Sequence, residues 1–384
     1  MGRRVSPAVI PGAAPRALRV AILTGPFTAY YDAQLTALRE RTGAVVEIAY
    51  QRARPEAPYD DSRFSALEGG LGWDVEAPAD RVADLVDRLH PDVLLVTSWN
   101  HGAYVRLART WRGRALRLMM MDNPWLGTPK QWGGVAISRL YLRPSFDVAF
   151  LPNERQRVFA RKLGFSEHEI WDGVYCCDQP RFEANRHKLD TPQTFLYVGR
   201  LVASKGVDDL LKAYAAYRQR VRDPWPLQLA GTGPLERAVA AAEGVASLGF
   251  RQPSHMPEVF ANAGCFVLPS IFEPWGIVIH EAAASGLPII CTTACGASLD
   301  LVRHGYNGFT VAASNVQALT DAMVLVSTMA AERLRSMGQA SVGLSRQLTP
   351  QRWADNFDER SRAWLTRAGH PAGNPGGGGS LGRS

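Results

Sequence analysis

The stretch FEPWGIVIHEAAASGLP, residues 272–288, decides the fold of this chain. It follows the apolar run CFVLPS at 265–270 and precedes a second apolar run, PIICTT, at 288–293. Short apolar runs on either side of a longer helical segment predict a strand, a loop, a helix and a second strand. This is half of a parallel-sheet unit, in which the helix connects two neighbouring strands.

Two carboxylates in this stretch are candidate ligand-binding groups. Glu273 follows the first strand, and Glu281 lies eight residues on, about one turn inside a helix that should begin near Gly276. A helix N-terminus offers unpaired N–H groups to an anion, and glycine allows a close approach to the backbone. Such a place suits a diphosphate, with the carboxylates accepting from sugar hydroxyls. The structural alternative is that Glu281 caps a helix and Glu273 is a solvated loop residue.

The segment FEPWGIVIHEAAASGLPII resembles the Glu-x7-Glu signature of retaining, nucleotide-sugar-dependent glycosyltransferases of the GT-B fold, specifically family 4. The resemblance extends to 296–311 and 196–214 and covers most of residues 194–330. It implies that Glu273 is catalytic and that the donor is bound by the following group: Trp275, Gly276, Ile277, Val278 and Glu281.

Further positions match the family's donor site. Arg200 and Lys205 match the Arg and Lys that hold the diphosphate, and cations fixed there neutralise the growing charge without a metal. Gly231 opens a turn that resembles the family's Gly-x-Gly-Pro. The resemblance implies that the backbone of Phe250 and Arg251 contacts the base. Met256, by the same comparison, packs beneath the base. Ordinary turn, strand-end and helix-cap roles remain open for these residues.

The first half of the chain departs from the family pattern. Many members have two glycines after the first strand that let the donor phosphate approach, and here only Gly25, before Pro26, occupies this place as a candidate donor-binding residue. Many also have a histidine where this chain has Asp122 and Asn123. We therefore consider Asp122 and His101 as candidate catalytic residues on the acceptor side. The alternatives are a loop cap for Asp122 and an ordinary loop histidine for His101.

A chain of 384 residues exceeds one typical core, so two domains are expected. We expect five units in chain order. They are a disordered arm over 1–17, a Rossmann-like acceptor domain over 18–185, a Rossmann-like donor domain over 193–350, a helix over 351–368 and a flexible tail over 369–384. The resemblance implies that the last helix returns to the first domain. The boundary is placed near 180–192, where periodicity is lost.

Apolar runs and helical periodicity alternate along both halves, which predicts two doubly wound parallel sheets facing each other across a cleft. In the first half the predicted strands lie at 18–24, 44–51, 91–99, 115–121 and 146–152. The predicted helices between them lie at 32–41, 78–89, 104–111 and 129–142.

The formal charge of +7 is spread along the chain, which argues against a nucleic-acid footprint. One local cluster comprises Arg106, Arg109, Arg112, Arg114 and Arg117, and the spacing of its first three members predicts one helix face. This face is either solvated or a contact for anionic lipid or a phosphorylated acceptor. No apolar run of 18 residues suggests a membrane-spanning helix. Five cysteines favour buried reduced thiols and a cytoplasmic location.

These patterns predict a retaining hexosyltransferase that uses a nucleoside diphosphate sugar, without a cofactor or metal, and a glycan or lipid-linked acceptor. Polysaccharide biosynthesis at the cell surface is the setting suggested by the resemblance. We also consider the inner face of a membrane as a partner that the protein contacts peripherally. The alternatives are a GT-B-like nucleotide-sugar epimerase and a catalytically silent partner that binds nucleotide sugars.

Overall fold

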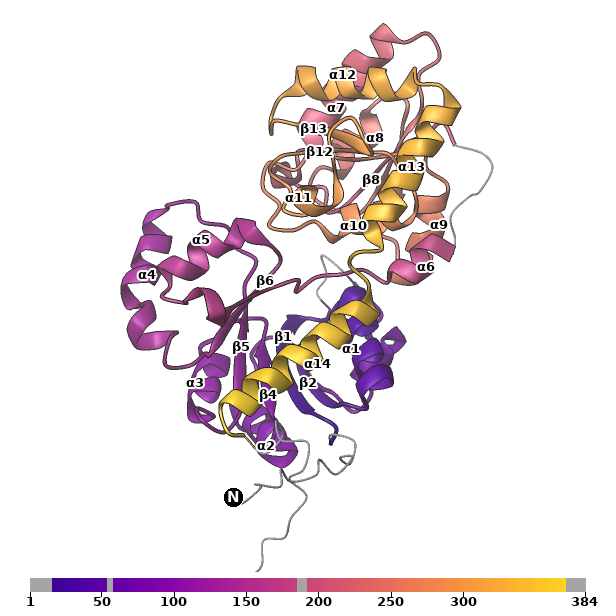
Figure 1. Cartoon of the computed structure of the whole chain (residues 1–384). Helices are drawn as coiled ribbons and strands as arrows, with labels where there is room; N and C mark the ends of the chain where they lie inside the picture. Colours follow the sequence, from indigo (N-terminus) through magenta and orange to yellow (C-terminus); the bar gives the residue numbers. More distant parts are fainter. Residues whose placement is uncertain (1–15, 54–57, 185–191, 371–384) are drawn as a thin grey trace, which may run out of the picture.

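The computed structural model describes residues 16–53, 58–184 and 192–370 (Figure 1). The predicted arm at 1–17 and tail at 369–384 lie almost entirely outside these ranges, and the boundary near 180–192 lies partly outside them. Each of the two lobes contains a parallel sheet covered by helices. The predicted α/β class with two doubly wound sheets is therefore confirmed.

The first sheet contains seven of the described strands in the order β3-β2-β1-β4-β5-β6-β7, and all neighbours are parallel. Its strands are β1 (Arg19–Pro26), β2 (Val45–Gln51), β3 (Leu71–Trp73), β4 (Val93–Val96), β5 (Leu116–Met120), β6 (Val148–Leu151) and β7 (Ile170–Asp172). The strand predicted at 91–99 is thus shorter than expected, because its last residues turn into the loop before the next helix.

Helices cover both faces of this sheet. They are α1 (Ala29–Thr42), α2 (Ala79–Leu89), α3 (Gly102–Thr110), α4 (Pro129–Tyr141) and α5 (Glu154–Lys162), with short 3₁₀ turns η1 (Asp61–Arg63), η2 (Ser65–Leu67) and η3 (Glu167–Glu169). The next helix, α6 (Gln179–Ala184), packs against the second lobe instead (Figure 1). In β1, Val20 and Ile22 join the core on the α1 side, whereas Ala21 and Leu23 join the core on the α2 and α3 side. Because side chains alternate along a strand, a strand buried on both faces is apolar throughout.

The second sheet has the order β10-β9-β8-β11-β12-β13 among the strands that the structure describes. Its strands are β8 (Phe195–Val198), β9 (Leu227–Ala230), β10 (Val245–Gly249), β11 (Cys265–Leu268), β12 (Ile289–Thr292) and β13 (Gly308–Val311). Its helices and turns are η4 (Ala203–Lys205), α7 (Val207–Arg220), α8 (Glu236–Ala241), η5 (Pro253–His255), α9 (Met256–Ala261), α10 (Ile277–Ala284), α11 (Ser298–Leu301), α12 (Val316–Ser327) and α13 (Ala331–Ser345).

The strand order reverses once in each sheet. In the first sheet β1 lies between β2 and β4, and in the second sheet β8 lies between β9 and β11. Loops leaving the carboxyl ends of the two strands at such a point run in opposite directions and leave a crevice between them. The topology therefore provides one ligand-binding crevice at each sheet.

The last helix, α14 (Pro350–Arg367), runs back from the second lobe and lies across the first, beside α1 (Figure 1). Its Trp353 and Phe357 are buried in the core, and Asp355 pairs with Arg41 of α1 at 2.6 Å. Within the described ranges, no helix combines the length and the apolar character that crossing a bilayer requires.

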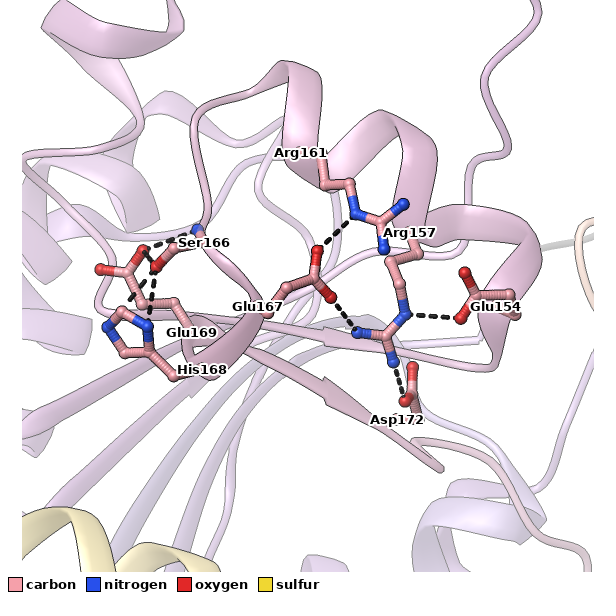
Figure 2. A network of polar contacts seen from close by, with 8 residues as sticks. All are labelled: Glu154, Arg157, Arg161, Ser166, Glu167, His168, Glu169 and Asp172. Carbon is pink, nitrogen blue, oxygen red and sulfur yellow. Dashed lines mark hydrogen bonds and ion pairs between the residues drawn. The ribbon is translucent and has the colours of Figure 1, made fainter.

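The short edge strand β7 and helix α6 fall in a stretch that sequence periodicity did not assign. Ion pairs around Arg157 of α5 surround this edge (Figure 2). Arg157 binds Glu154 at 2.6 Å and Glu167 at 3.0 Å, and it also pairs with Asp172 at the end of β7. A three-residue strand carries too little periodicity to be recognised, so contacts with a neighbouring helix determine it.

Candidate active site

A cavity of about 270 Å³ lies between the two lobes, outside the carboxyl ends of β8, β9 and β10. The start of α1 in the first lobe, with Thr28, Ala29, Tyr30, Asp32 and Ala33, and the segment 59–64 contribute to its other side. The predicted donor-binding residues that line it are Arg200, Gly231, Phe250, Arg251, Met256, Ile277, Val278 and Glu281. Residues from four separate motifs are thus brought to one cavity at the reversal point of the second sheet.

Glu281 is the fifth residue of α10 and lines this cavity. Burial raises the pKa of its carboxyl from the ordinary 4.5 to about 7, because few polar groups solvate the charged form. The carboxylate makes no hydrogen bond with another described residue. It is therefore available to accept hydrogen bonds from the hydroxyls of a ligand.

The N-terminus of α10 also faces the cavity, through Ile277 and Val278. The first N–H groups of a helix have no intrahelical acceptor, so they can bind an anion. Gly276 precedes them with φ 92°, a left-handed conformation that side chains disfavour, and a Cβ there would lie 3.0 Å from Cγ of Glu273. Glycine is thus required by the backbone and by the neighbouring Glu273.

Glu273 and Lys205 lie together at the reversal point of the second sheet. Glu273 follows β11 and Lys205 ends η4, and Nζ of Lys205 lies 2.5 Å from Oε2 of Glu273. Both side chains are mostly buried, with 15% of Lys205 and 12% of Glu273 exposed. Neither lines the two cavities described here. Arg200, by contrast, is exposed into the first cavity.

A second cavity of about 640 Å³ lies in the first lobe, outside the carboxyl ends of β1, β4 and β5. The predicted residues Gly25, Asp122 and Asn123 line it, as does Phe272 of the central motif. Tyr30 lines both cavities, so the two spaces adjoin at this ring. The reversal point of the first sheet therefore meets that of the second.

Asp122 follows β5 and accepts a hydrogen bond from the hydroxyl of Tyr175, with 3.2 Å between Oδ2 and the phenol oxygen. Burial raises the pKa of this carboxyl above its ordinary value of 3.8, and the hydrogen bond from Tyr175 opposes that rise. This hydrogen bond holds the carboxylate at the cavity wall, and among the described residues it makes no hydrogen bond that would cap the loop containing Pro124.

Two predicted site residues lie elsewhere. His101 precedes α3 and lines neither cavity, since its ring packs 5.4 Å from the ring of Trp73 and 5.5 Å from that of Tyr104. Trp275 is buried against Tyr175 with 5.8 Å between ring centroids, and it also lines neither cavity. Trp275 thus lies behind Tyr175, which lines the second cavity, whereas His101 packs within the first lobe; Lys205, Glu273 and Gly276 likewise line neither cavity.

The predicted arginine face needs a correction. Helix α3 ends at Thr110, so Arg112 lies beyond it and cannot share a helix face with Arg106 and Arg109. Arg117 is buried in β5 and pairs with Asp147 at 2.6 Å. The run of arginines therefore divides into exposed and buried members because one helix ends and a central strand begins within it.

Sequence reasoning missed several residues that build the site, notably Tyr30, Tyr175 and Gln156. The buried Gln156 donates from Nε2 to the carbonyl of Asp122 at 2.9 Å and to that of Pro274 at 3.1 Å. It thus joins the loop after β5 to the central motif of the other lobe. A glutamine in an amphipathic helix gives no sequence signal for such a role.

Comparison with known proteins finds relatives among glycosyltransferases. Residues 192–328 match the family model for glycosyl transferases group 1. The chain is 28% identical over 205 residues to an uncharacterized glycosyltransferase of Methanocaldococcus jannaschii, which covers 51% of this chain and 50% of the relative. It is 29% identical over 251 residues to a GDP-mannose-dependent alpha-(1-6)-phosphatidylinositol monomannoside mannosyltransferase of Mycobacterium tuberculosis, covering 58% of this chain and 63% of the relative.

The fold matches across a greater length. The structure of Anabaena Alr3699/HepE in complex with UDP and glucose superposes with a TM-score of 0.69 at 15% identity, covering 89% of this chain and 98% of that one. In sequence, however, the chain spans only about half the length of the first curated relative. The second lobe thus matches the model of the family of glycosyl transferases group 1, and the chain has the GT-B fold.

Proposed function

We propose that this protein is a retaining glycosyltransferase that moves a hexosyl group from a nucleoside diphosphate sugar to a glycan or lipid-linked acceptor. The observation that carries the proposal is the meeting of two cavities at Tyr30, each at the reversal point of a parallel sheet. A donor in the first cavity would present its sugar toward an acceptor in the second. The relatives include an enzyme named for GDP-mannose and a structure that holds UDP and glucose, which supports this donor class.

The donor side has the groups that such a reaction needs. Negative charge builds on the diphosphate as the bond to the sugar breaks, and fixed cations stabilise it most when they are already in place. Arg200, the N–H groups at the start of α10 and Lys205 supply that positive charge, and Glu273 binds sugar hydroxyls. Glu281 accepts from the ribose hydroxyls. We propose that these groups act without a metal ion.

The acceptor side is the cavity of the first lobe. Asp122, held by Tyr175, would stabilise positive charge that develops on the sugar ring or accept a hydrogen bond from the attacking hydroxyl. Phe272 and Leu126 give this cavity an apolar part, which suits a lipid-linked sugar or the face of a glycan. Cell-surface or exopolysaccharide synthesis is the setting that we propose.

We also propose a cytoplasmic enzyme that touches the inner face of a membrane. The five cysteines are buried and unpaired, as a reducing compartment favours. Helix α4, beside the acceptor cavity, leaves Trp132, Ile137 and Leu140 more than half exposed. An apolar helix face flanked by basic residues is suited to lie in the interface of a bilayer.

A ligand panel tests the donor proposal. UDP, GDP, ADP and their hexose conjugates are screened for a rise in melting temperature, since a ligand at 100 times its Kd stabilises by about 2.7 kcal/mol. The conjugate that binds is then incubated with glycan and lipid-linked acceptors in excess EDTA, and NMR identifies the anomer of the product. We expect transfer with retention and an unchanged rate in EDTA.

Other results would point to other activities. A change of sugar configuration without any acceptor would indicate an epimerase, and binding without turnover would indicate a silent partner. Loss of the rate in EDTA with recovery on Mn²⁺ or Mg²⁺ would contradict metal independence. An inverted anomer would contradict retention, and the absence of any shift would contradict the donor site itself.

A further inference from the structure

A segment of the first lobe, residues 58–64, forms part of the donor cavity of the second lobe. Its anchor is the side-chain amide of Gln252, which follows β10. Oε1 of Gln252 accepts from the backbone N–H of Asp60 at 3.2 Å, and Nε2 donates to the carbonyl of Pro58 at 2.9 Å. The amide therefore binds the backbone on both sides of Tyr59.

Two arginines add contacts at the same place. Arg63 donates to Oγ of Ser254 at 3.0 Å, and Arg181 donates to the backbone carbonyl of Ser254 at 3.1 Å. Three of the four hydrogen bonds link residues 58–63 to residues 252–254 of the second lobe, and the fourth, from Arg181 of α6, binds Ser254 from the second-lobe side. The segment is thus held at the cavity by several directional contacts, in addition to apolar packing.

These contacts place the ring of Tyr59 in the wall of the donor cavity. The ring lies 5.7 Å from that of Phe250 and 6.4 Å from that of Phe64. Phe250 belongs to the segment that, by family resemblance, receives the base. The hydroxyl of Tyr59 makes no hydrogen bond with another described residue. An aromatic face and an unused hydroxyl therefore face the space where the nucleoside would lie.

The electrostatics of Tyr59 agree with this position. Burial raises the pKa of its hydroxyl above 10, the nearby charge of Glu281 raises it further, and Arg200 opposes the rise. The hydroxyl thus stays protonated at neutral pH, and it lies near both the carboxylate and the cation that we assign to the donor. A protonated phenol can donate a hydrogen bond to ribose or phosphate oxygen atoms.

We propose that Tyr59 is a nucleoside-binding residue that the first lobe contributes to the donor site, and that Gln252 is the positioning residue that holds it there. This inference rests on the proposed function and goes beyond it, because it makes the nucleotide site a product of both lobes. Stacking on an aromatic ring tolerates any base, so Tyr59 supplies affinity for the nucleoside and Gln252 fixes its location.

The test compares a nucleotide with its phosphate part alone. UDP, GDP, ADP and inorganic pyrophosphate are titrated by calorimetry into the full chain carrying Tyr59→Ala, Tyr59→Phe or Gln252→Ala. We expect Tyr59→Ala to weaken the best nucleotide by about tenfold or more, since base stacking contributes roughly 1–3 kcal/mol. Tyr59→Phe should weaken it by less than about threefold, and pyrophosphate binding should not change in any variant.

Gln252 is tested by a double-mutant cycle with Tyr59. Gln252→Ala should weaken the nucleotide severalfold when Tyr59 is present and have no further effect in Tyr59→Ala, because the two residues act as one unit. The matched control is Arg52→Ala, at the start of the same connection, where the side chain of Arg52 pairs with the exposed Asp74. Its nucleotide affinity should equal that of the wild type.

Each alternative result overturns a distinct claim. Wild-type nucleotide affinity in Tyr59→Ala, or an equal loss for pyrophosphate, would refute the nucleoside contact. Tighter binding in Tyr59→Ala would mean that the ring occupies the place of the ligand. Additive losses in the double variant would refute the positioning role of Gln252. If the unaltered chain binds none of the nucleotides, the proposed donor function fails instead.

Discussion

Lys205 and Glu273 form a close ion pair at the centre of the candidate site, with 2.5 Å between Nζ and Oε2. If Lys205 stabilises the leaving diphosphate, it must exchange part of this contact for the ligand. We predict that Lys205→Ala lowers turnover about 100- to 1,000-fold, the scale of losing one preorganised electrostatic group. Initial rates at saturating donor measure this. Lys212→Ala, which lines neither cavity, is the control, and normal turnover in Lys205→Ala would contradict the assignment.

Asp122 can be tested by removing its charge while keeping its shape. If the carboxylate stabilises the transition state, Asp122→Asn should lower turnover while the melting temperature and nucleotide Kd stay the same. If it only supports the loop, the variant should lose about 1 kcal/mol of stability and little activity. The hydrogen bond from Tyr175 favours the first outcome, because it orients the carboxylate along the cavity wall. Kinetics and thermal melts on the same samples distinguish the two.

Helix α10 carries two neighbouring groups with opposite pKa shifts. His280 is fully buried, and burial lowers its pKa from 6.5 to about 4. Its Nδ1 accepts from the N–H of Cys177 at 3.1 Å, and Nε2 lies 3.1 Å from the carbonyl of Ser345, so Nε2 carries the proton. Burial raises the pKa of Glu281 from 4.5 to about 7. One helix thus holds a neutral histidine and a carboxylic acid that is half protonated near neutral pH.

The two groups should oppose each other in stability between pH 4.5 and 6.5. In this pH range His280 binds more protons in the unfolded state than in the folded state. Its contribution to the free energy of unfolding is therefore complete above pH 6.5 and is lost as the pH falls toward 4. Glu281 binds more protons in the folded state than in the unfolded state. Its contribution to the free energy of unfolding is therefore complete below pH 4.5 and is lost as the pH rises through 7. In the wild type the two opposite changes of unfolding free energy with pH therefore partly cancel.

Removing either group should reveal the pH dependence of stability that the other group causes. We predict that in Glu281→Gln the free energy of unfolding rises between pH 4.5 and 6.5, whereas in His280→Gln it falls over the same range. At about 1.4 kcal/mol per pKa unit, each change amounts to at most about 3 kcal/mol. Urea denaturation across pH 4.5–7.5 measures both variants against the wild type. Parallel curves for the three proteins would show that neither group titrates as described.

Helix α4 is the element that we expect to contact a membrane. Leu140, Ile137 and Trp132 are 77%, 59% and 54% exposed, and Lys130 and Arg139 are exposed on the same helix. Basic residues near an anionic surface contribute about 1 kcal/mol each and are screened by salt. We predict flotation with anionic liposomes that weakens at high salt and in a variant carrying both Ile137→Ser and Leu140→Ser.

The control for α4 is Leu325→Ser on α12 of the second lobe, where Leu325 is 45% exposed. This variant should float like the wild type. Equal recovery with neutral liposomes, or full recovery after both α4 substitutions, would show that this helix face is simply solvated. The exposed Arg106 and Arg109 of α3 would add to the charge but do not form the predicted three-residue face.

At the scale of the whole molecule, buried polar contacts hold the two lobes in register. Gln156 bridges the carbonyls of Asp122 and Pro274, and Nδ2 of Asn153 donates to the carbonyl of Gly296 at 3.1 Å and to Asp300 at 2.6 Å. Because Asp122 and Pro274 belong to opposite sides of the site, Gln156 sets the distance between them. Its position is thus important for aligning donor and acceptor.

We predict that Gln156→Leu, of similar size, destabilises the protein by about 1–3 kcal/mol, since two buried carbonyls lose their donor. Turnover should fall as well, because the two loops lose their shared donor. Urea unfolding and initial rates measure the two effects. Gln317→Leu on α12, where Gln317 contacts exposed Asp321, is the matched control and should alter neither. Normal turnover in Gln156→Leu would mean that other contacts align the lobes.

Local sequence signals predicted several of the longer helices, such as α1 and α2, and the central strands buried on both faces. The unit β11, α10 and β12 was expected from 265–293 and is confirmed, because its apolar runs and its glycine at φ 92° are properties of a few adjacent residues. The three-residue strands β3 and β7 were not predicted, since pairing with neighbours and ion pairs such as Arg157 with Asp172 determine them. Short edge strands depend on residues distant in sequence.

The sequence by itself determined the alternation of strands and helices, the two parallel sheets and the residues at the carboxyl ends of the second sheet. These follow from local periodicity and from the rule that ligands gather where strand order reverses. Only the tertiary structure decided that Tyr59 and Tyr30 reach the donor cavity, that Gln156 joins the lobes and that His101 packs against Trp73 instead. Side-chain contacts between residues that are distant in the sequence depend on how whole elements pack, and no short segment encodes that packing.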